Sequence, residues 1–210
     1  MRKRIYLLLV ILTLYGCAGL KPPVTAPAPG SRLARGIKAD AIVELEKGST
    51  LRGRARILAK APASFRIEVL GPFNITMALI ISDGKSLYVV SGAREKEYLW
   101  QDPSFPYSFR AEDVVSSLLG EPPKTAGAVE KSDYAVSSGS DGNVRITRMK
   151  DGKPVLTVVM SDFRNVSGAR LPFNVMIEDK REALKIKYSS VEIDPVFPPD
   201  SFVITPILSH

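Results

Sequence analysis

Few side chains in this sequence belong to the types that catalyse reactions. The 210 residues include one cysteine, Cys17, and one histidine, His210. A lone histidine argues against Ser–His and Cys–His catalysis and against histidine-rich metal sites, because each needs further groups at defined distances. The adjacent acids Glu112 and Asp113 open a predicted helix, where carboxylates interact favourably with the helix dipole. We therefore expect a protein that is not an enzyme and that holds no metal and no dissociable cofactor.

Cys17 stands at the end of an apolar run. The basic residues Arg2–Arg4 precede the run Ile5–Leu14, which is shorter than the ~20 residues of a membrane-spanning helix. Basic residues followed by a short apolar core are typical of an export signal. The ending Leu14–Cys17 resembles the lipobox of bacterial lipoproteins, which implies cleavage before Cys17 and acylation of that residue as a covalent membrane anchor. An ordinary secretory signal with an incidental cysteine is the alternative.

These signals divide the chain into three parts. We expect residues 1–16 to be a signal peptide, 17–35 an acylated cysteine with a proline-rich linker, and 36–210 a folded domain. Proline-rich segments are extended and semi-rigid, so the linker would act as a spacer between the membrane and the domain. Ala18 follows the cysteine, and by resemblance to the enteric sorting rule it favours the periplasmic face of the outer membrane over the inner membrane.

The charge of the chain gives no case for a nucleic-acid partner. Loss of Arg2–Arg4 with the signal lowers the formal net charge from +7 to about +4. No basic cluster is interleaved with aromatic residues, as a nucleic-acid surface would require.

After Gly36, apolar and polar residues alternate with the period of two that is typical of β-strands. A strand and then a turn are predicted in Ser64–Asn74, and the remaining strands are predicted at Ile37–Glu46, Leu51–Lys60, Asn74–Ser82, Ser86–Ser91, Glu97–Trp100, Tyr134–Ser138, Asn143–Lys150, Pro154–Ser161, Leu171–Glu178 and Ala183–Asp194. Arg110–Leu119 has the apolar spacing of a helix, and Gly120 ends it. The pattern predicts a mainly β fold: an open, strongly curved antiparallel sheet, or unclosed half-barrel, of about ten strands with one short helix as a lid or a plug.

The first predicted hairpin carries charges on one face and small residues on the other. A turn at Lys47–Ser49 would place Glu44 opposite Arg52 and Asp40 opposite Arg56, where opposite charges stabilise a strand pair. The arginine row formed by Arg52, Arg54 and Arg56 is either a solvated face with its own counter-charges or a site for lipid head groups or lipopolysaccharide. The inner face is built from small residues, so it either packs closely against another element or leaves space; these residues are Ala39, Ala41, Gly53 and Ala55.

Two segments carry a family resemblance. The stretch Phe65–Asn74 (FRIEVLGPFN), followed by a strand, the turn Asp83–Lys85 and Leu87–Val90 (LYVV), resembles the LolB family of outer-membrane lipoprotein receptors and its LolB-like relatives. The later stretch Phe197–Pro206 (FPPDSFVITP) resembles the last segment of LolA- and LolB-like proteins. One departure is Glu121–Asp133, which is short and loop-like where LolB has more helical material.

The resemblance implies a function. LolB-like proteins receive the acyl chains of a lipoprotein in a hydrophobic cavity and pass them to the outer membrane, and we expect such a monomeric protein here, supplied by a periplasmic LolA-type carrier. The side chains expected to line the cavity are Val43, Phe65, Ile67, Val69 and Ile186. In the family, the loop after the Gly-Pro pair carries an exposed leucine, so Leu70 and Phe73 are expected to form a membrane-inserting loop. The alternative for Phe73 is a side chain folded into the core.

A second class of function also fits these features. An assembly or structural lipoprotein would use the same sheet to bind a protein partner in the envelope. A cavity of several hundred Å³ on the inner face would favour lipid as the ligand, whereas a filled interior would favour a protein partner.

Overall fold

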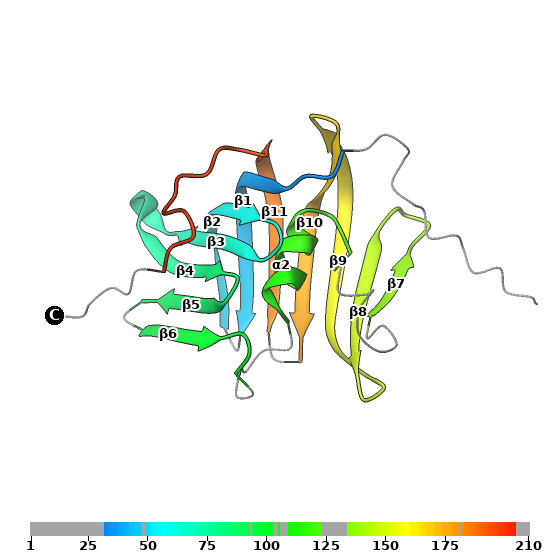
Figure 1. Cartoon of the computed structure of the whole chain (residues 1–210), viewed down its shortest axis with the longest axis horizontal. Coiled ribbons are helices and arrows are strands. Elements are labelled where there is room, and N and C mark those ends of the chain that lie inside the picture. The colour runs from blue at the N-terminus through cyan, green and yellow to red at the C-terminus, as the bar shows by residue number, and fades with distance from the viewer. Residues whose placement is uncertain are drawn as a thin grey trace, which may run out of the picture.

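The computed structural model describes residues 32–47, 49–92, 94–102, 105, 109–122, 134–180 and 182–204. These residues form one antiparallel sheet of eleven strands, a single α-helix, α2 (Ala111–Leu118), and a 3₁₀ turn, η2 (Pro72–Asn74) (Figure 1). The strands are β1 (Gly36–Lys47), β2 (Ser49–Lys60), β3 (Ser64–Leu70), β4 (Thr76–Asp83), β5 (Ser86–Ser91), β6 (Arg94–Leu99), β7 (Tyr134–Ser138), β8 (Val144–Lys150), β9 (Lys153–Val166), β10 (Ala169–Asp179) and β11 (Ala183–Ile193). The predicted fold class is confirmed, with eleven strands where about ten were expected.

Two runs of consecutive strands meet in the middle of the sheet. The strand order is β6-β5-β4-β3-β2-β1-β11-β10-β9-β8-β7, so β1 and β11 are neighbours although they are far apart in the chain. Their pairing sets Val43 opposite Ile186. Strands β6 and β7 are the two edges, and no pairing joins them within the described residues, which leaves the barrel open. The segment that connects these two edges carries α2.

The register of the first hairpin agrees with the prediction, but its ion pairs do not. Glu44 lies opposite Arg52, and Asp40 lies opposite Arg56. Both acids have their side-chain partners on a third strand, β11, and not on β2 as expected. The Nζ atom of Lys185 lies 3.3 Å from Glu44, and Asp40 accepts a hydrogen bond of 3.0 Å from Ser190. Strand β1 lies between β2 and β11, so each of its carboxylates can pair with a side chain from either strand. The prediction from sequence considered only β2, which follows β1 in the chain.

Two strand boundaries differ from the prediction by three residues or more. Strand β6 begins at Arg94, three residues before the predicted start at Glu97. Strand β9 was expected to end at Ser161 and continues to Val166. In this last part Phe163 and Val166 pack against the core, while Asp162 is exposed and bonded to Arg164 at 2.7 Å.

Helix α2 packs on the inner face of the sheet, defined here as the face that carries Phe65, Ile67 and Val69. It contacts β2, β3 and β10, and Figure 1 shows it in front of the sheet near β10. Gly120 follows the helix with a φ of +76°, and a Cβ atom there would lie 2.7 Å from Cδ of Pro172. Glycine is therefore required at this position both for the turn and for the close approach of β10.

Candidate functional site

The inner face of the sheet, covered by α2, is the first candidate site. The side chains of Val114, Val115 and Leu118 are buried and belong to the same core cluster as the sheet residues beneath them. That cluster also contains all five residues that were expected to line a cavity: Val43, Phe65, Ile67, Val69 and Ile186. The structure brings these five together on one face, where they are in contact with other core side chains. In this conformation α2 therefore fills the interior.

The small residues of the β1–β2 hairpin are explained by this packing. Ala39, Ala41 and Ala55 are buried, and a Cβ atom on Gly53 would lie 3.0 Å from Val69. Of the two expectations for these residues, close packing against another element is what the structure shows.

Two tyrosine hydroxyls form hydrogen bonds between the sheet and α2. The hydroxyl of Tyr188 on β11 donates a hydrogen bond of 3.2 Å to the carbonyl oxygen of Leu118. At the other end of the helix, the hydroxyl of Tyr134 on β7 donates a hydrogen bond of 2.7 Å to the carboxylate of Asp113. A tyrosine hydroxyl from a central strand and one from an edge strand thus hold the two ends of the helix. Burial raises the pKa of Tyr188, so its hydroxyl stays protonated and remains a donor.

Asp113 is a buried acid with several partners. Its side chain is 1% exposed and accepts a hydrogen bond of 2.8 Å from the backbone N–H of Arg110. The guanidinium of Arg148 lies 3.9 Å away. Burial raises the pKa of this carboxyl, and the bonds from Tyr134 and Arg110 with the charge of Arg148 oppose that shift only in part. The sequence pattern assigned Asp113 to the helix dipole, and nothing in it indicated a tyrosine from β7 as partner.

A pH-dependent effect is expected for Asp113→Asn. Because the folded-state pKa of Asp113 is raised, its contribution to stability is fully present below the unfolded-state pKa and is lost as the pH rises through the folded-state pKa. The neutral amide should therefore stabilise the protein relative to Asp113 more at pH 7 than at pH 4. Urea unfolding of both proteins at the two pH values measures this difference.

Asp162→Asn is the matched control for this prediction. A hydrogen bond from Arg164 lowers the pKa of Asp162, so its contribution to stability is present above the unfolded-state pKa and is lost as the pH falls. Relative to the unmodified protein, Asp162→Asn should lose more stability at pH 7 than at pH 4. Equal pH profiles for Asp113→Asn and the unmodified protein would contradict the assignment of Asp113 as a buried group with a raised pKa.

The turn between β3 and β4 is the second candidate site. Phe73 is 95% exposed, whereas Leu70 is 5% exposed. The structure therefore separates the two residues expected in a membrane-inserting loop: Leu70 ends β3 inside the protein, and Phe73 is not folded into the core. Ile75 and Met77 are also exposed, and together with Phe73 they are called the apolar tip below.

The backbone of the apolar tip is strained. Phe73 has a φ of +59° and Asn74 a φ of +60°, in the left-handed region that costs a non-glycine residue about 1 kcal/mol or more. A Cβ atom on Gly71 would lie 2.3 Å from the sulfur of Met77, so the Met77 side chain packs directly over this glycine. An exposed phenylalanine on a strained backbone contributes little to folding, and such residues are often found at functional sites.

Other expectations fall partly outside the described residues. The signal peptide at 1–16, Cys17 and the linker as far as residue 31 are not described, and neither is His210. In the described ranges, no group of three or more His, Cys, Asp or Glu side chains is placed to hold a metal ion. No helix in those ranges has the length and hydropathy needed to cross a membrane.

Comparisons with known proteins give structural neighbours only. No protein-family model matches the chain, and no curated protein matches its sequence. The chain is similar to the structure of a LolA superfamily protein from Nitrosomonas europaea, with 13% identity, a TM-score of 0.48, and coverage of 83% of this chain and 93% of that one. It is also similar to a DUF1329 family protein from Desulfovibrio piger, with 12% identity, a TM-score of 0.48, and coverage of 81% and 90%.

A third structure in this comparison is a domain from Vibrio parahaemolyticus described as an outer membrane lipoprotein-sorting protein. It shares 10% identity and a TM-score of 0.46, over 80% of this chain and 88% of that domain. Solved structures of the LolA and lipoprotein-sorting group, which the sequence resembles, are thus among those to which the chain is similar.

Proposed function

We propose that this protein is a non-enzymatic lipoprotein of the bacterial envelope that binds acyl chains on the inner face of its sheet and takes part in lipoprotein or lipid transfer to the outer membrane. The observation that carries the proposal is the apolar inner face of an open sheet, covered by a single short helix. Acyl chains on Cys17 would hold the domain at the periplasmic face of the outer membrane, since two or three chains are needed for stable anchoring.

Helix α2 is proposed to act as a lid. It has eight residues, and a helix of that length is marginal in water unless tertiary contacts stabilise it. Its polar contacts with the described strands are made near its two ends, at Asp113 and Leu118. Displacement of α2 would expose an apolar trough formed by Val43, Phe65, Ile67, Val69 and Ile186. The interior packed by α2 would then represent the closed state of a carrier that holds no acyl chain.

The apolar tip is proposed to insert into the membrane during delivery. Phe73, Ile75 and Met77 project from the turn between β3 and β4, and Phe73 is almost fully exposed. Apolar side chains at such a tip gain free energy on entering the acyl region of a bilayer. The donor would be a soluble periplasmic carrier of the LolA type, and the protein would act as a monomer.

Acyl-chain binding is tested with the chain from residue 17, carrying Cys17→Ala so that it is not acylated. A fluorescent fatty-acid probe should bind saturably, because displacement of α2 gives the chain an apolar site, and a triacylated lipopeptide should compete with the probe. Circular dichroism before and after titration establishes that the protein is folded. Absence of saturable binding by the folded protein would exclude the carrier function.

The second candidate function is an assembly lipoprotein that binds a protein partner. Two observations favour it: the interior is filled in this conformation, and the apolar tip resembles the exposed aromatic anchors of protein interfaces. Probe binding separates the two functions, since a permanently packed interior would exclude the probe while the tip would still mediate crosslinking to another envelope protein.

A further inference from the structure

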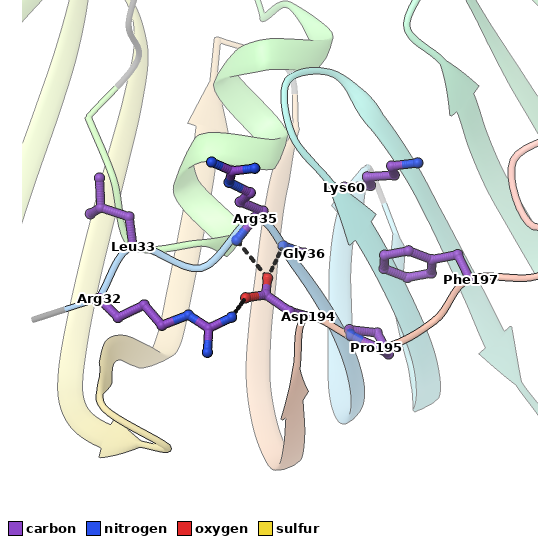
Figure 2. Close-up of a pocket in the computed structure, with 8 residues that line it drawn as sticks. All are labelled: Arg32, Leu33, Arg35, Gly36, Lys60, Asp194, Pro195 and Phe197. Atoms are coloured by element: carbon purple, nitrogen blue, oxygen red, sulfur yellow. Dashed lines mark hydrogen bonds and ion pairs between the residues drawn. The ribbon is translucent and has the colours of Figure 1, made fainter.

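A hollow lies where the chain enters β1 and leaves β11, away from the inner face. Its volume is about 660 Å³, and the residues that line it come from the segment before β1, the end of β2 and the segment after β11. Figure 2 shows these side chains. We call this hollow the entry pocket, and its polar lining consists of Arg32, Arg35, Lys60 and Asp194.

Asp194 holds the entry pocket in shape. Its Oδ1 atom accepts hydrogen bonds of 2.7 Å from the backbone N–H of Arg35 and 3.0 Å from that of Gly36, and its carboxylate forms an ion pair with Arg32 (Figure 2). Burial alone would raise the pKa of Asp194, but the two amides and Arg32 outweigh burial and lower it. The single carboxylate of the pocket is therefore ionised at neutral pH and already neutralised by its partners.

The aromatic wall of the entry pocket is packed against the backbone. A Cβ atom on Gly36 would lie 2.8 Å from the ring of Phe197, so the ring rests directly on the glycine. Phe197 also packs edge to face on Phe202, with ring centroids 5.2 Å apart. The segment after β11 is thereby fixed beside the segment before β1.

Two cations in the entry pocket have no counter-charge among the described residues. The side chains of Arg35 and Lys60 are exposed, and neither forms a hydrogen bond or an ion pair with another described residue. In Figure 2 both side chains extend from the backbone without a dashed contact to the residues drawn. The pocket thus offers two free cationic groups to an anionic ligand.

Exposed apolar side chains flank these cations. Leu33, which lines the pocket, is 55% exposed, and Val196, next to Pro195, is 96% exposed. Basic side chains beside exposed apolar ones are typical of surfaces that lie at a membrane interface, where the cations meet phosphates and the apolar groups enter the acyl boundary.

A neighbouring hollow on the outer face fits an anion less well. It has a volume of about 720 Å³ and contains Arg54 and Arg56 of the arginine row. Its lining also includes Lys38 and Arg66, so four cations stand against the three carboxylates of Asp40, Glu68 and Glu192, a formal net charge of +1. The entry pocket has three cations against the one carboxylate of Asp194, a formal net charge of +2.

We propose that the entry pocket binds the phosphate of an anionic phospholipid at the membrane surface, with Arg35 and Lys60 as phosphate ligands and Leu33 and Val196 in contact with the lipid. Arg32 lies fifteen residues after Cys17 in the sequence, a length that reaches at most about 45 Å in polyproline conformation. A domain tethered through Cys17 would thus keep this pocket within reach of the bilayer. The pocket is separate from the inner face, so this binding does not depend on acyl-chain transfer.

Vesicle binding of the unacylated chain tests the proposal. The chain from residue 17 with Cys17→Ala is sedimented with vesicles of phosphatidylcholine alone or mixed with phosphatidylglycerol, and binding is expected only to the mixed vesicles. Arg35→Gln with Lys60→Gln should lower the partition coefficient roughly 30-fold, because each cation near an anionic surface contributes about a fivefold gain. Arg94→Gln with Lys96→Gln on edge strand β6 removes the same charge and should change binding by less than about threefold.

Three results would overturn the proposal. One is equal loss of vesicle binding in the two double variants, which would indicate a net-charge effect. Another is full retention of binding in the Arg35 and Lys60 variant. The third is saturable binding of inorganic phosphate without binding to mixed vesicles, which would make the site one for soluble phosphate. Arg35→Lys with Lys60→Arg keeps both cations and should restore vesicle binding. Binding of the fatty-acid probe should be equal in all variants, so failure of the phospholipid proposal can be told apart from failure of the acyl-chain proposal.

Discussion

Phe73→Glu is expected to lower the rate of lipopeptide transfer from this protein to vesicles by roughly 10- to 100-fold. This is the effect expected when one apolar side chain is lost from the contact with the membrane. The side chain is 95% exposed, so the substitution removes no packing and the unfolding temperature should not change. The measurement is the rate at which a fluorescent lipopeptide moves from the preloaded protein into acceptor vesicles.

Two further variants separate the role of Phe73 from that of any exposed apolar group. Phe73→Leu keeps an apolar side chain at the tip and should retain most of the transfer rate. Leu99→Glu introduces the same charge at another exposed apolar position, on edge strand β6, and should leave transfer unchanged. Normal transfer by Phe73→Glu would remove the apolar tip from the delivery step.

Much of the strand pattern could be predicted because buried and less buried residues alternate along several strands. In β3, Phe65, Ile67 and Val69 are buried while the residues between them are only partly covered, which is the period-two signal in the sequence. The turn at Lys47–Ser49 then determines the β1–β2 register, since a one-residue slip would move every apolar side chain to the wrong face. The local pattern and the turn length were sufficient to predict this strand and the register of this hairpin.

Contacts between distant segments could not be predicted in the same way. The pairing of β1 with β11 places Lys185 beside Glu44 and lets Asp194 accept a hydrogen bond from the backbone of Arg35. Neither contact has a local sequence signal, because the residues involved are more than 100 positions apart. The partner of Asp113 had no local sequence signal either, since Tyr134 lies on β7, 21 positions further along the chain.

The sequence pattern could place the five expected side chains on one face of the sheet, but it could not show whether that face is open or packed. All five expected cavity residues lie together on the inner face, because alternation assigns each one to that face. Whether the space between them is open depends on how α2 packs across three strands, and helix periodicity alone does not determine this. The free cations of the entry pocket were missed because they come from the ends of two strands, where no repeated pattern exists.

Phe65→Ala is expected to have opposite effects on stability and on ligand binding. Phe65 is 1% exposed and is among the largest fully buried side chains. Its truncation should lower the free energy of unfolding by about 3–5 kcal/mol, the loss of apolar burial plus the cost of a cavity. The cavity would lie on the inner face beneath α2, so the affinity for the fatty-acid probe should rise while stability falls. Urea unfolding and probe titration of the same preparation measure both quantities.

Phe73→Ala is the matched control, since it makes the same chemical change at an exposed position. It should alter the free energy of unfolding by less than about 0.5 kcal/mol and leave probe affinity unchanged. If Phe65→Ala is folded and destabilised yet binds the probe no more tightly, the space beneath α2 is not where acyl chains bind. The inner face would then be a packed core, and the partner-binding function would account for the apolar tip.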